Sequence, residues 1–182
     1  TKDYAMHLAL NYKKKPFLGV VLIPERNELW IADGTKLLRE KKEKSLMQIK
    51  LFKKTTLQDM VVVTSKNHRN QTLKKLIDKV GFKQVNIMGS IGCKISSILR
   101  NEADIYISLS LPGQSAPKDW DFSAPEVILK AAGGAITNLY NEDLIYGNSN
   151  FEQGGVIIAS NNKTLHKNYC SQIREIIKKN KL

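Results

Sequence analysis

The segment KDWDFSAPEVILKAAGG, residues 118–134, carries the start and stop signals of a helix. Ser123 and Glu126 have the spacing of a capping box, in which a hydroxyl and a carboxylate each accept a hydrogen bond from the backbone of the first turn. Pro125 would lose no needed hydrogen bond in that turn, and Gly133 can adopt the left-handed conformation that ends a helix. These signals predict a helix that begins near Ser123, with Glu126 in a structural role.

Strand and helix patterns alternate on both sides of this segment. Short apolar runs predict buried strands, and apolar residues spaced by three and four predict helices. Such alternation is typical of a layered α/β fold. The predicted strands are 60–64, 82–88, 103–109, 135–139 and 155–159, and the predicted helices are 73–80, a segment through Ile95, Ile98 and Leu99, the helix from Ser123, and 165–177.

The first 58 residues show only strand patterns, which predict an antiparallel meander. Residues 4–11 alternate, with Met6, Leu8 and Leu10 on one face, whereas 17–23 is a continuous apolar run that predicts a strand buried on both faces. Further strands are expected at 28–32, near Leu37 and at 48–51, and the charged segment 39–45 is expected to form a loop or hairpin tip.

These patterns predict two lobes. Residues 1–58 would be the remainder of an N-terminal antiparallel lobe, and residues 59–182 a complete C-terminal α/β lobe. Because Thr1 stands almost directly at a strand and is not Met, we expect the chain to be the C-terminal part of a longer protein. An incomplete first sheet would leave unpaired edges and apolar surface, so self-association is also expected.

Composition narrows the class of protein. The chain has 182 residues, 42% of them hydrophobic and 25% charged, which is typical of a globular domain. No apolar run is as long as a membrane span, and Cys93 and Cys170 lack the spacing of a metal or redox motif, so we expect a cytoplasmic protein without a membrane partner. The net charge of +12 comes from scattered, mostly lysine side chains, which suits a small polyanionic substrate better than nucleic acid.

Asp121 is the first candidate for chemistry. A carboxylate at the start of a helix is stabilised by the helix dipole, remains ionised and can bind a hard cation such as Mg²⁺. Aspartate is also common at helix starts without any metal, so both interpretations stay open on spacing alone. Trp120 beside it is predicted to pack in the core.

Two loops that follow predicted strands could bind an anion. Ser65 and His68 lie just after the strand 60–64 and could donate to one phosphate, or could simply cap the next helix. In Gly89-Ser90-Ile91-Gly92-Cys93-Lys94, glycines before a helix could let backbone amides approach an anion, and Lys94 would add a full charge. Convergence of these loops with Asp121 predicts a site for a phosphate and a metal together.

The segment 88–134 resembles the 3′(2′),5′-bisphosphate nucleotidases of the inositol monophosphatase superfamily, whose second signature is W-D-x-x-A-P-E-x-I-L-x-x-x-G-G. The loop 64–68 is similar to their S-x-S-H loop, with Asn67 in place of the second serine, and FLGVVLIP (17–24) and GVIIASN (155–161) resemble strands of the same family. The resemblance implies an inositol-monophosphatase-like layered α/β fold, N-terminally truncated.

The resemblance also implies an activity: Mg²⁺-dependent removal of the 3′-phosphate from adenosine 3′,5′-bisphosphate, giving AMP and phosphate. Asp121 would then be a metal ligand. The residues implied to contact the nucleotide, chiefly its retained phosphate, are Ser65, His68, Ser90 and Lys94.

One part of the family pattern is missing. The first signature, Asp-Pro-x-Asp-Gly-Thr, and the upstream Glu-Glu pair, which provide most metal ligands and the water-activating groups, are not present, so the catalytic residues are expected upstream of Thr1. Thr1 could itself be the signature threonine, but an alignment without a gap places it just before the strand. Asp33-Gly34-Thr35 resembles a piece of the signature and is predicted to be a turn.

Two other functions remain open. The chain could derive from an inositol monophosphatase, although a substrate with one phosphate needs no second anion pocket. It could also be a non-catalytic module that binds AMP-like anions. In each case we expect little or no phosphatase activity from this chain alone, because Mg²⁺ affinity depends on the number of ligands.

Overall fold

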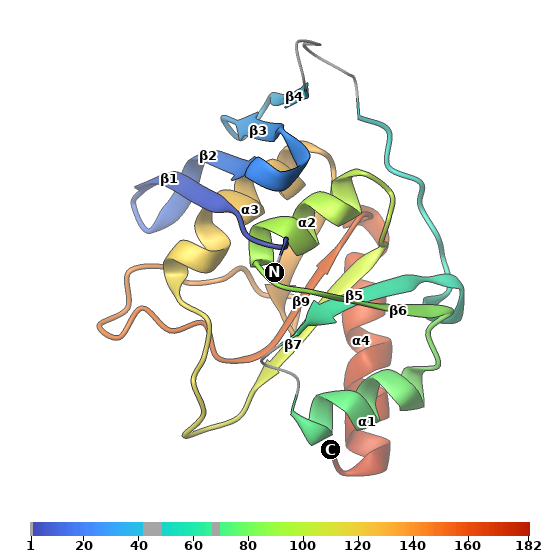
Figure 1. Ribbon diagram of the computed structural model, residues 1–182. Coiled ribbons are helices and arrows are strands. Elements are labelled where there is room, and N and C mark those ends of the chain that lie inside the picture. The colour runs from blue at the N-terminus through green and yellow to red at the C-terminus, as the bar shows by residue number, and fades with distance from the viewer. Residues whose placement is uncertain (1, 42–48, 67–69) are drawn as a thin grey trace.

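The computed structural model describes residues 2–41, 49–66 and 70–182, which form four stacked layers (Figure 1). The first layer is an antiparallel sheet in the strand order β1-β2-β3-β4. Its strands are β1 (Met6–Tyr12), β2 (Lys15–Ile23), β3 (Glu28–Ala32) and β4 (Leu37–Lys41), with a short 3-10 helix η1 (Pro24–Arg26) between β2 and β3.

The second sheet is mixed and has the order β6-β5-β7-β9-β8. Strand β5 pairs in parallel with β6 and β7, whereas β9 pairs antiparallel with β7 and β8. Its strands are β5 (Val61–Ser65), β6 (Gln84–Met88), β7 (Ile105–Ser110), β8 (Ala135–Asn138) and β9 (Gly155–Ser160), preceded by η2 (Leu57–Asp59).

Helices fill the space between the sheets and cover the far face of the second sheet. Helices α2 (Ile91–Leu99) and α3 (Asp119–Ala131) pack between the two sheets, and α1 (Gln71–Val80) and α4 (Lys163–Asn180) lie on the other side of the second sheet (Figure 1). One apolar cluster joins the first sheet to α2, α3 and one face of the second sheet, and another joins its opposite face to α1 and α4. The predicted α/β class is confirmed.

The predicted division at residue 58 falls in the connection between the two sheets. The division into two lobes remains a prediction. Val21 and Trp30 of the first sheet share a continuous core with Ile128 of α3 and Tyr106 of β7.

Most predicted elements are present, but two early segments differ. Arg39–Lys41 were expected in a loop and instead belong to β4, because the Arg39 guanidinium lies 2.5 Å from Glu28 on the neighbouring strand and stacks over the Trp30 ring. Residues 49–51 were expected to be a strand and are irregular, while Gln48 lies outside the described residues. The predicted turn at Asp33 is confirmed, since its Oδ1 accepts a hydrogen bond from the Lys36 amide at 2.9 Å.

Helix α3 begins earlier than its sequence signals indicate. It starts at Asp119, so Pro125 lies inside the helix and Ser123 is not its cap. Asp121 in the first turn accepts a hydrogen bond from the Lys118 amide at 2.7 Å and takes the part that was assigned to Glu126. Glu126 is structural, as predicted, but its partners are Tyr146 and Lys130.

The prediction that residues 17–23 form a strand buried on both faces is wrong, because Val21 and Ile23 of β2 are buried whereas Val20 and Leu22 on its other face are only half-buried. The alternation of β1 is confirmed, since Met6, Leu8 and Leu10 share one face, but that face points away from the helices and leaves each side chain more than half exposed.

The prediction that Trp120 packs in the core is wrong, because its side chain is 60% exposed and lies beside the Phe151 ring.

A buried charge network fastens the first sheet to α2. The Glu28 carboxylate is 1% exposed and accepts from Arg39 on β4 and from Arg100, which follows α2, at 2.6 Å. Arg100 also pairs with Glu102 at 2.8 Å. Because both guanidinium groups converge on one carboxylate, the network sets how β3 and β4 sit against α2.

A buried histidine predicts acid sensitivity of the fold. His166 is 1% exposed, with its ring nitrogens 2.9 Å from Thr137 Oγ1 and 2.7 Å from Ser160 Oγ. Burial lowers the pKa of His166 to about 4. As the pH falls, the unfolded chain therefore takes up a proton on His166 before the folded chain does. The free energy of unfolding is unaffected by this group above the ordinary histidine pKa of about 6.5. It decreases by on the order of 3 kcal/mol as the pH drops from there toward 4.

The His166 contribution can be separated from that of the carboxylates. Urea unfolding of the parent chain and of His166→Gln, measured at pH 7 and pH 5, should show a smaller pH-dependent loss in the variant. Equal losses in the two proteins would contradict the assignment.

Candidate phosphate-binding site

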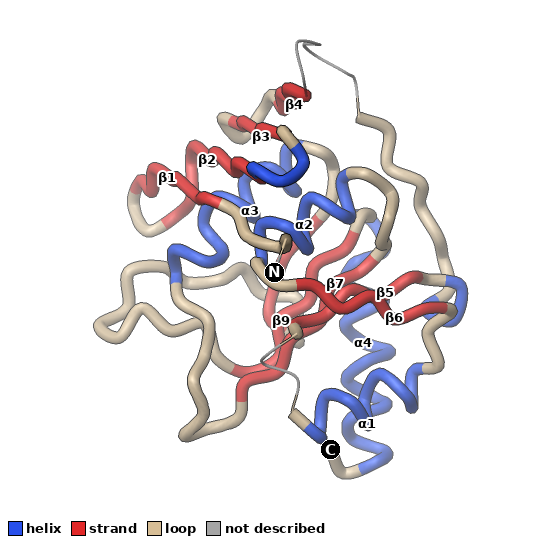
Figure 2. Tube along the Cα trace, in the orientation of Figure 1, coloured by secondary structure: helices blue, strands red, loops and turns tan. Residues whose placement is uncertain are grey.

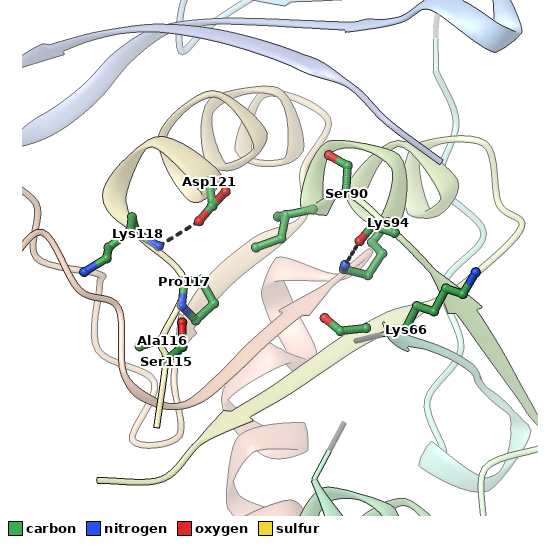
Figure 3. Close-up of a pocket in the computed structure, with 11 residues that line it drawn as sticks. Lys66, Ser90, Lys94, Ser115, Ala116, Pro117, Lys118 and Asp121 are labelled. Atoms are coloured by element: carbon green, nitrogen blue, oxygen red, sulfur yellow. Dashed lines mark hydrogen bonds between the residues drawn. The ribbon is translucent and has the colours of Figure 1, made fainter. Parts of the chain in front are cut away.

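Four of the five predicted site residues, Ser65, Ser90, Lys94 and Asp121, line one cavity of about 380 Å³ (Figure 3). One wall is the end of β5, with Ser65 and Lys66. The second is the start of α2 with the loop before it, and the third is the segment from Ser115 to Asp121 at the start of α3. The site therefore forms where the carboxyl end of a strand meets the amino ends of two helices, an arrangement that favours anions.

Lys94 is the strongest electrostatic feature of the cavity. Its side chain is 1% exposed, its Nζ donates to the Gly89 carbonyl, and the same nitrogen lies 5.7 Å from the centre of the Tyr106 ring. Within the described parts of the chain, no carboxylate forms an ion pair with Lys94. Burial therefore lowers the pKa of Lys94 to about 8, and a bound anion would offset that cost.

Ser90 is the N-cap of α2. Its Oγ accepts from the Gly92 amide at 3.2 Å and lies 3.4 Å from Nε2 of His7, while its own amide donates to the Asp3 carbonyl at 3.0 Å. The Ser90 and Gly92 amides thus already have protein partners. An anion in this cavity would meet the Ser90 hydroxyl and the Lys94 ammonium rather than these two amides.

The two glycines of this loop have a different role from the one their sequence suggests. A Cβ on Gly89 would overlap the Asp3 backbone, and one on Gly92 would overlap the His7 imidazole. The missing side chains therefore make room for the segment that leads into β1, which packs directly on the start of α2.

Ser65 is the last residue of β5 and is 7% exposed. Ser65 was alternatively expected to cap the next helix. The N-cap of α1 is instead Asn70, whose side chain accepts a hydrogen bond from the Leu73 amide at 2.8 Å. His68 and Asn67 lie outside the described residues, so the predicted contact of His68 with a phosphate stays a prediction.

Asp121 faces the same cavity from α3 (Figure 3). One carboxylate oxygen accepts from the Lys118 amide, and the Lys118 side chain turns away to Glu152 at 2.9 Å. A carboxylate with a second oxygen available suits a hard cation such as Mg²⁺. The described residues contain no group of three or more His, Cys, Asp or Glu that could hold a metal, and the metal role of Asp121 stays a prediction.

His7 belongs to the edge of the site and was not predicted. Its Nδ1 lies 3.3 Å from the Trp120 carbonyl, next to Asp121, and burial is the main cause that lowers the pKa of His7. The sequence shows it only as a polar residue in an alternating strand. Its position depends on β1 crossing the starts of both α2 and α3, which no local pattern encodes.

The lowered pKa of Lys94 predicts a pH profile for anion binding. Above pH 8 the empty site loses the charge of Lys94, so affinity for a phosphate monoester should fall about tenfold between pH 7 and pH 9, where the monoester remains a dianion. The nearby acidic groups Asp3, Asp121 and Cys93 oppose the loss of the proton without abolishing it. Calorimetric titrations at pH 7, 8 and 9 test this, and an affinity that does not change with pH would contradict it.

Comparisons with known proteins identify the family of this chain. The model of the inositol monophosphatase family matches residues 1–178. The chain is 32% identical over 120 residues to 3′(2′),5′-bisphosphate nucleotidase 1 of Mus musculus, a match that covers 65% of this chain and 37% of the mouse protein. The chain thus spans little more than a third of that relative.

Solved structures share the fold. An inositol monophosphatase from Anabaena superimposes with a TM-score of 0.73 at 20% identity, covering 96% of this chain and 65% of that one. CysQ from Bacteroides thetaiotaomicron, described as a bacterial member of the same family, gives a TM-score of 0.70 at 20% identity, covering 89% of this chain and 64% of that one.

Among the described residues no helix combines the length and apolar character needed to cross a bilayer.

Proposed function

The chain belongs to the inositol monophosphatase family, and we propose that it forms the phosphate-binding part of a Mg²⁺-dependent phosphatase. The substrate we propose is adenosine 3′,5′-bisphosphate, which would lose its 3′-phosphate to give AMP. The observation that carries this proposal is the cavity in which the buried Lys94 ammonium, without a carboxylate partner among the described residues, and the Asp121 carboxylate line the same space.

The residues of this chain would act mainly on the phosphate that is retained. Lys94 would hold it by a desolvated charge, and the Ser65 and Ser90 hydroxyls would donate to its oxygens. We propose that His68 is a further donor rather than a base. Binding energy from this remote phosphate would hold the reacting one in place.

Asp121 would hold the cation on the side of the scissile phosphate. Mg²⁺, when bound, would supply neutralisation of the phosphate charge. Asp121 is pre-oriented for this role, because its hydrogen bond to the Lys118 amide fixes the carboxylate in the first turn of α3. Because Asp121 is the one carboxylate that lines this cavity among the described residues, we expect turnover by these 182 residues to be slow or absent.

Calorimetry with the complete chain tests the proposed function. AMP, adenosine 3′,5′-bisphosphate and inositol 1-phosphate would each be titrated with and without Mg²⁺, and phosphate release would be measured in parallel. We expect both nucleotides to bind and inositol 1-phosphate to bind at least tenfold more weakly. Equal or tighter binding of inositol 1-phosphate would contradict the proposal.

Two other functions have an observation in their favour. Similarity to the Anabaena inositol monophosphatase favours an inositol phosphate substrate, but an inositol monophosphate carries no second phosphate for Lys94. The pairing of an anion pocket with one carboxylate favours a module that binds AMP without hydrolysis. Binding of AMP that is indifferent to Mg²⁺, with no turnover of any of the three compounds, would support that module.

Asp121→Asn tests the metal role separately from the phosphate role. Asparagine keeps an oxygen that can accept from the Lys118 amide, so the helix start should survive. We expect Mg²⁺ to tighten adenosine 3′,5′-bisphosphate binding by several-fold in the parent and not at all in the variant, with metal-free AMP binding unchanged. Asp143→Asn, an exposed carboxylate outside this cavity, is the matched control and should retain the Mg²⁺ effect.

A further inference from the structure

His7 connects the starts of the two helices that border the anion cavity. It lies on β1, which packs against α3 and follows a segment that passes the start of α2 (Figure 2). Its Nδ1 lies 3.3 Å from the Trp120 carbonyl in α3, and its Nε2 lies 3.4 Å from Oγ of Ser90, the N-cap of α2. Ser90 lines the cavity and His7 does not, so His7 can act on a bound anion through the Ser90 hydroxyl.

The Ser90 hydroxyl has one proton to donate, and a neutral His7 takes it. A carbonyl can only accept, so the contact with Trp120 places a proton on Nδ1 of His7. In the neutral ring Nε2 is then an acceptor, and the Ser90 hydroxyl donates to it. The Ser90 oxygen also accepts from the Gly92 amide at 3.2 Å. With this set of partners, the Ser90 hydroxyl has no proton left for an anion.

Protonation of His7 removes this conflict. The imidazolium carries a proton on both nitrogens, so Nε2 donates to Ser90 Oγ while Nδ1 still donates to the Trp120 carbonyl. The Ser90 oxygen then accepts two hydrogen bonds, one from His7 and one from the Gly92 amide. Its own proton is free to point into the cavity. Every contact of the empty site is kept, and a donor to the anion is gained.

The charges around His7 favour the imidazolium when the cavity holds an anion. In the empty site burial is the main cause that lowers the pKa of His7. The Lys94 ammonium on α2 lowers it further, whereas the Trp120 carbonyl and the Asp121 carboxylate on α3 raise it. A dianion beside Lys94 would offset the repulsion by that ammonium and attract the imidazolium.

A second cavity gives the His7 ring access to solvent protons. His7 lines this cavity of about 350 Å³ together with Asp119 and Ser123 of α3. The two oxygens of Asp119 already accept from the Gly147 amide and the Gln153 side chain, each at 2.6 Å. A proton can therefore reach the ring from this side while an anion occupies the other cavity.

We propose that His7 is a positioning residue for the anion: binding draws a solvent proton onto its imidazole, and the imidazolium turns the Ser90 hydroxyl toward the bound anion. The inference rests on the proposed function, because it takes the cavity with Lys94 as an anion site. Anion binding and proton uptake are then linked, so affinity should rise as the pH falls from 7.5 to 5.5. Lys94 is largely protonated throughout this range, since its pKa is about 8.

Calorimetry with sulfate in metal-free buffer tests this linkage. Sulfate stays a dianion between pH 7.5 and pH 5.5, whereas a phosphate monoester takes up a proton near about pH 6. We expect the complete chain to bind sulfate roughly fivefold more tightly at pH 5.5 than at pH 7.5. His7→Gln keeps an oxygen that can accept from Ser90 but cannot be protonated, so most of this change should disappear in the variant.

The ring signals of His7 in NMR spectra give a second readout, and in the parent they need no variant that folds beyond the His7→Gln used to assign them. Saturating sulfate should raise the pKa of His7, and Ser90→Ala should reduce that shift to less than half, because the imidazolium loses its acceptor. Ser123→Ala is the matched control, since it removes a hydroxyl beside His7 that does not line the anion cavity, and it should keep the full shift.

The outcomes separate this proposal from the proposed function. Sulfate binding without a change in the pKa of His7, an equal change in Ser90→Ala, or an unaltered pH dependence in His7→Gln would overturn the role of His7 and leave the anion site in place. Failure of the parent chain to bind sulfate at either pH would overturn the anion site and, with it, both proposals.

Discussion

Replacement of Lys94 by methionine is expected to weaken AMP binding by roughly 100-fold, about 3 kcal/mol, because it removes a desolvated charge from the phosphate. Methionine fills much of the same volume, so the cavity walls should stay in place. The buried ammonium donates to the Gly89 carbonyl but has no carboxylate partner among the described residues. Loss of its desolvation cost offsets loss of that hydrogen bond, so stability should change by no more than about 1 kcal/mol.

Calorimetry for affinity and urea unfolding for stability measure the two effects together. Lys75→Met on α1 makes the same change of charge at an exposed site and should alter neither quantity. If the loss of AMP affinity in Lys94→Met only matched its loss of stability, the role of Lys94 would be in folding and not in anion binding. Unchanged AMP affinity would remove the main support for the proposed function.

Replacement of Arg100 by methionine is expected to destabilise the chain by about 3 kcal/mol, because a buried carboxylate loses one of its two cations. The variant leaves the Glu28 carboxylate, which is 1% exposed, with Arg39 as its remaining cation, and leaves Glu102 without its closer partner. Because the network joins β3 and β4 to the end of α2, loss of Arg100 should loosen the first sheet before the second.

Arg26→Met is the matched control for Arg100. Its guanidinium pairs with Glu102 at 3.1 Å, but both side chains are about 40% exposed, and exposed pairs contribute less than about 1 kcal/mol. The double variant Glu28→Leu with Arg100→Met should recover part of the loss, since it removes the buried carboxylate together with its more buried cation and leaves Arg39, whose side chain is 18% exposed, without Glu28. Destabilisation by Arg26→Met equal to that by Arg100→Met would show that burial is not the cause.

Sequence reasoning succeeded where local periodicity decides the structure. Helix α1 follows from apolar residues at Leu73, Leu76, Ile77 and Val80 and ends at Gly81, as its pattern predicts. The strands β5, β7 and β9 of the second sheet were predicted because each contains a short run of apolar residues. The three site elements could be placed together because they all follow strands or begin helices at the same edge of the fold.

Sequence reasoning failed where a partner distant in the chain decides the outcome. The start of α3 depends on Asp121 bonding to the Lys118 amide, whereas the sequence offers Ser123 as an equally good cap. Arg39 joins a strand only because Glu28 and Trp30 lie opposite. Exposure of Trp120 likewise depends on what surrounds it in space.

The contact between residues 3–7 and α2 couples ligand binding in the cavity to opening of the first strand. Ser90 is hydrogen-bonded to the Asp3 backbone, the Cys93 thiol reaches the Tyr4 carbonyl at 3.4 Å, and Gly92 lies beneath His7. A ligand that locks Ser90 and Lys94 in place therefore also slows fraying of the first strand. By reciprocity, detachment of this strand would lower the affinity for the ligand. Hydrogen exchange at the amides of the strand should therefore become slower when the cavity is occupied.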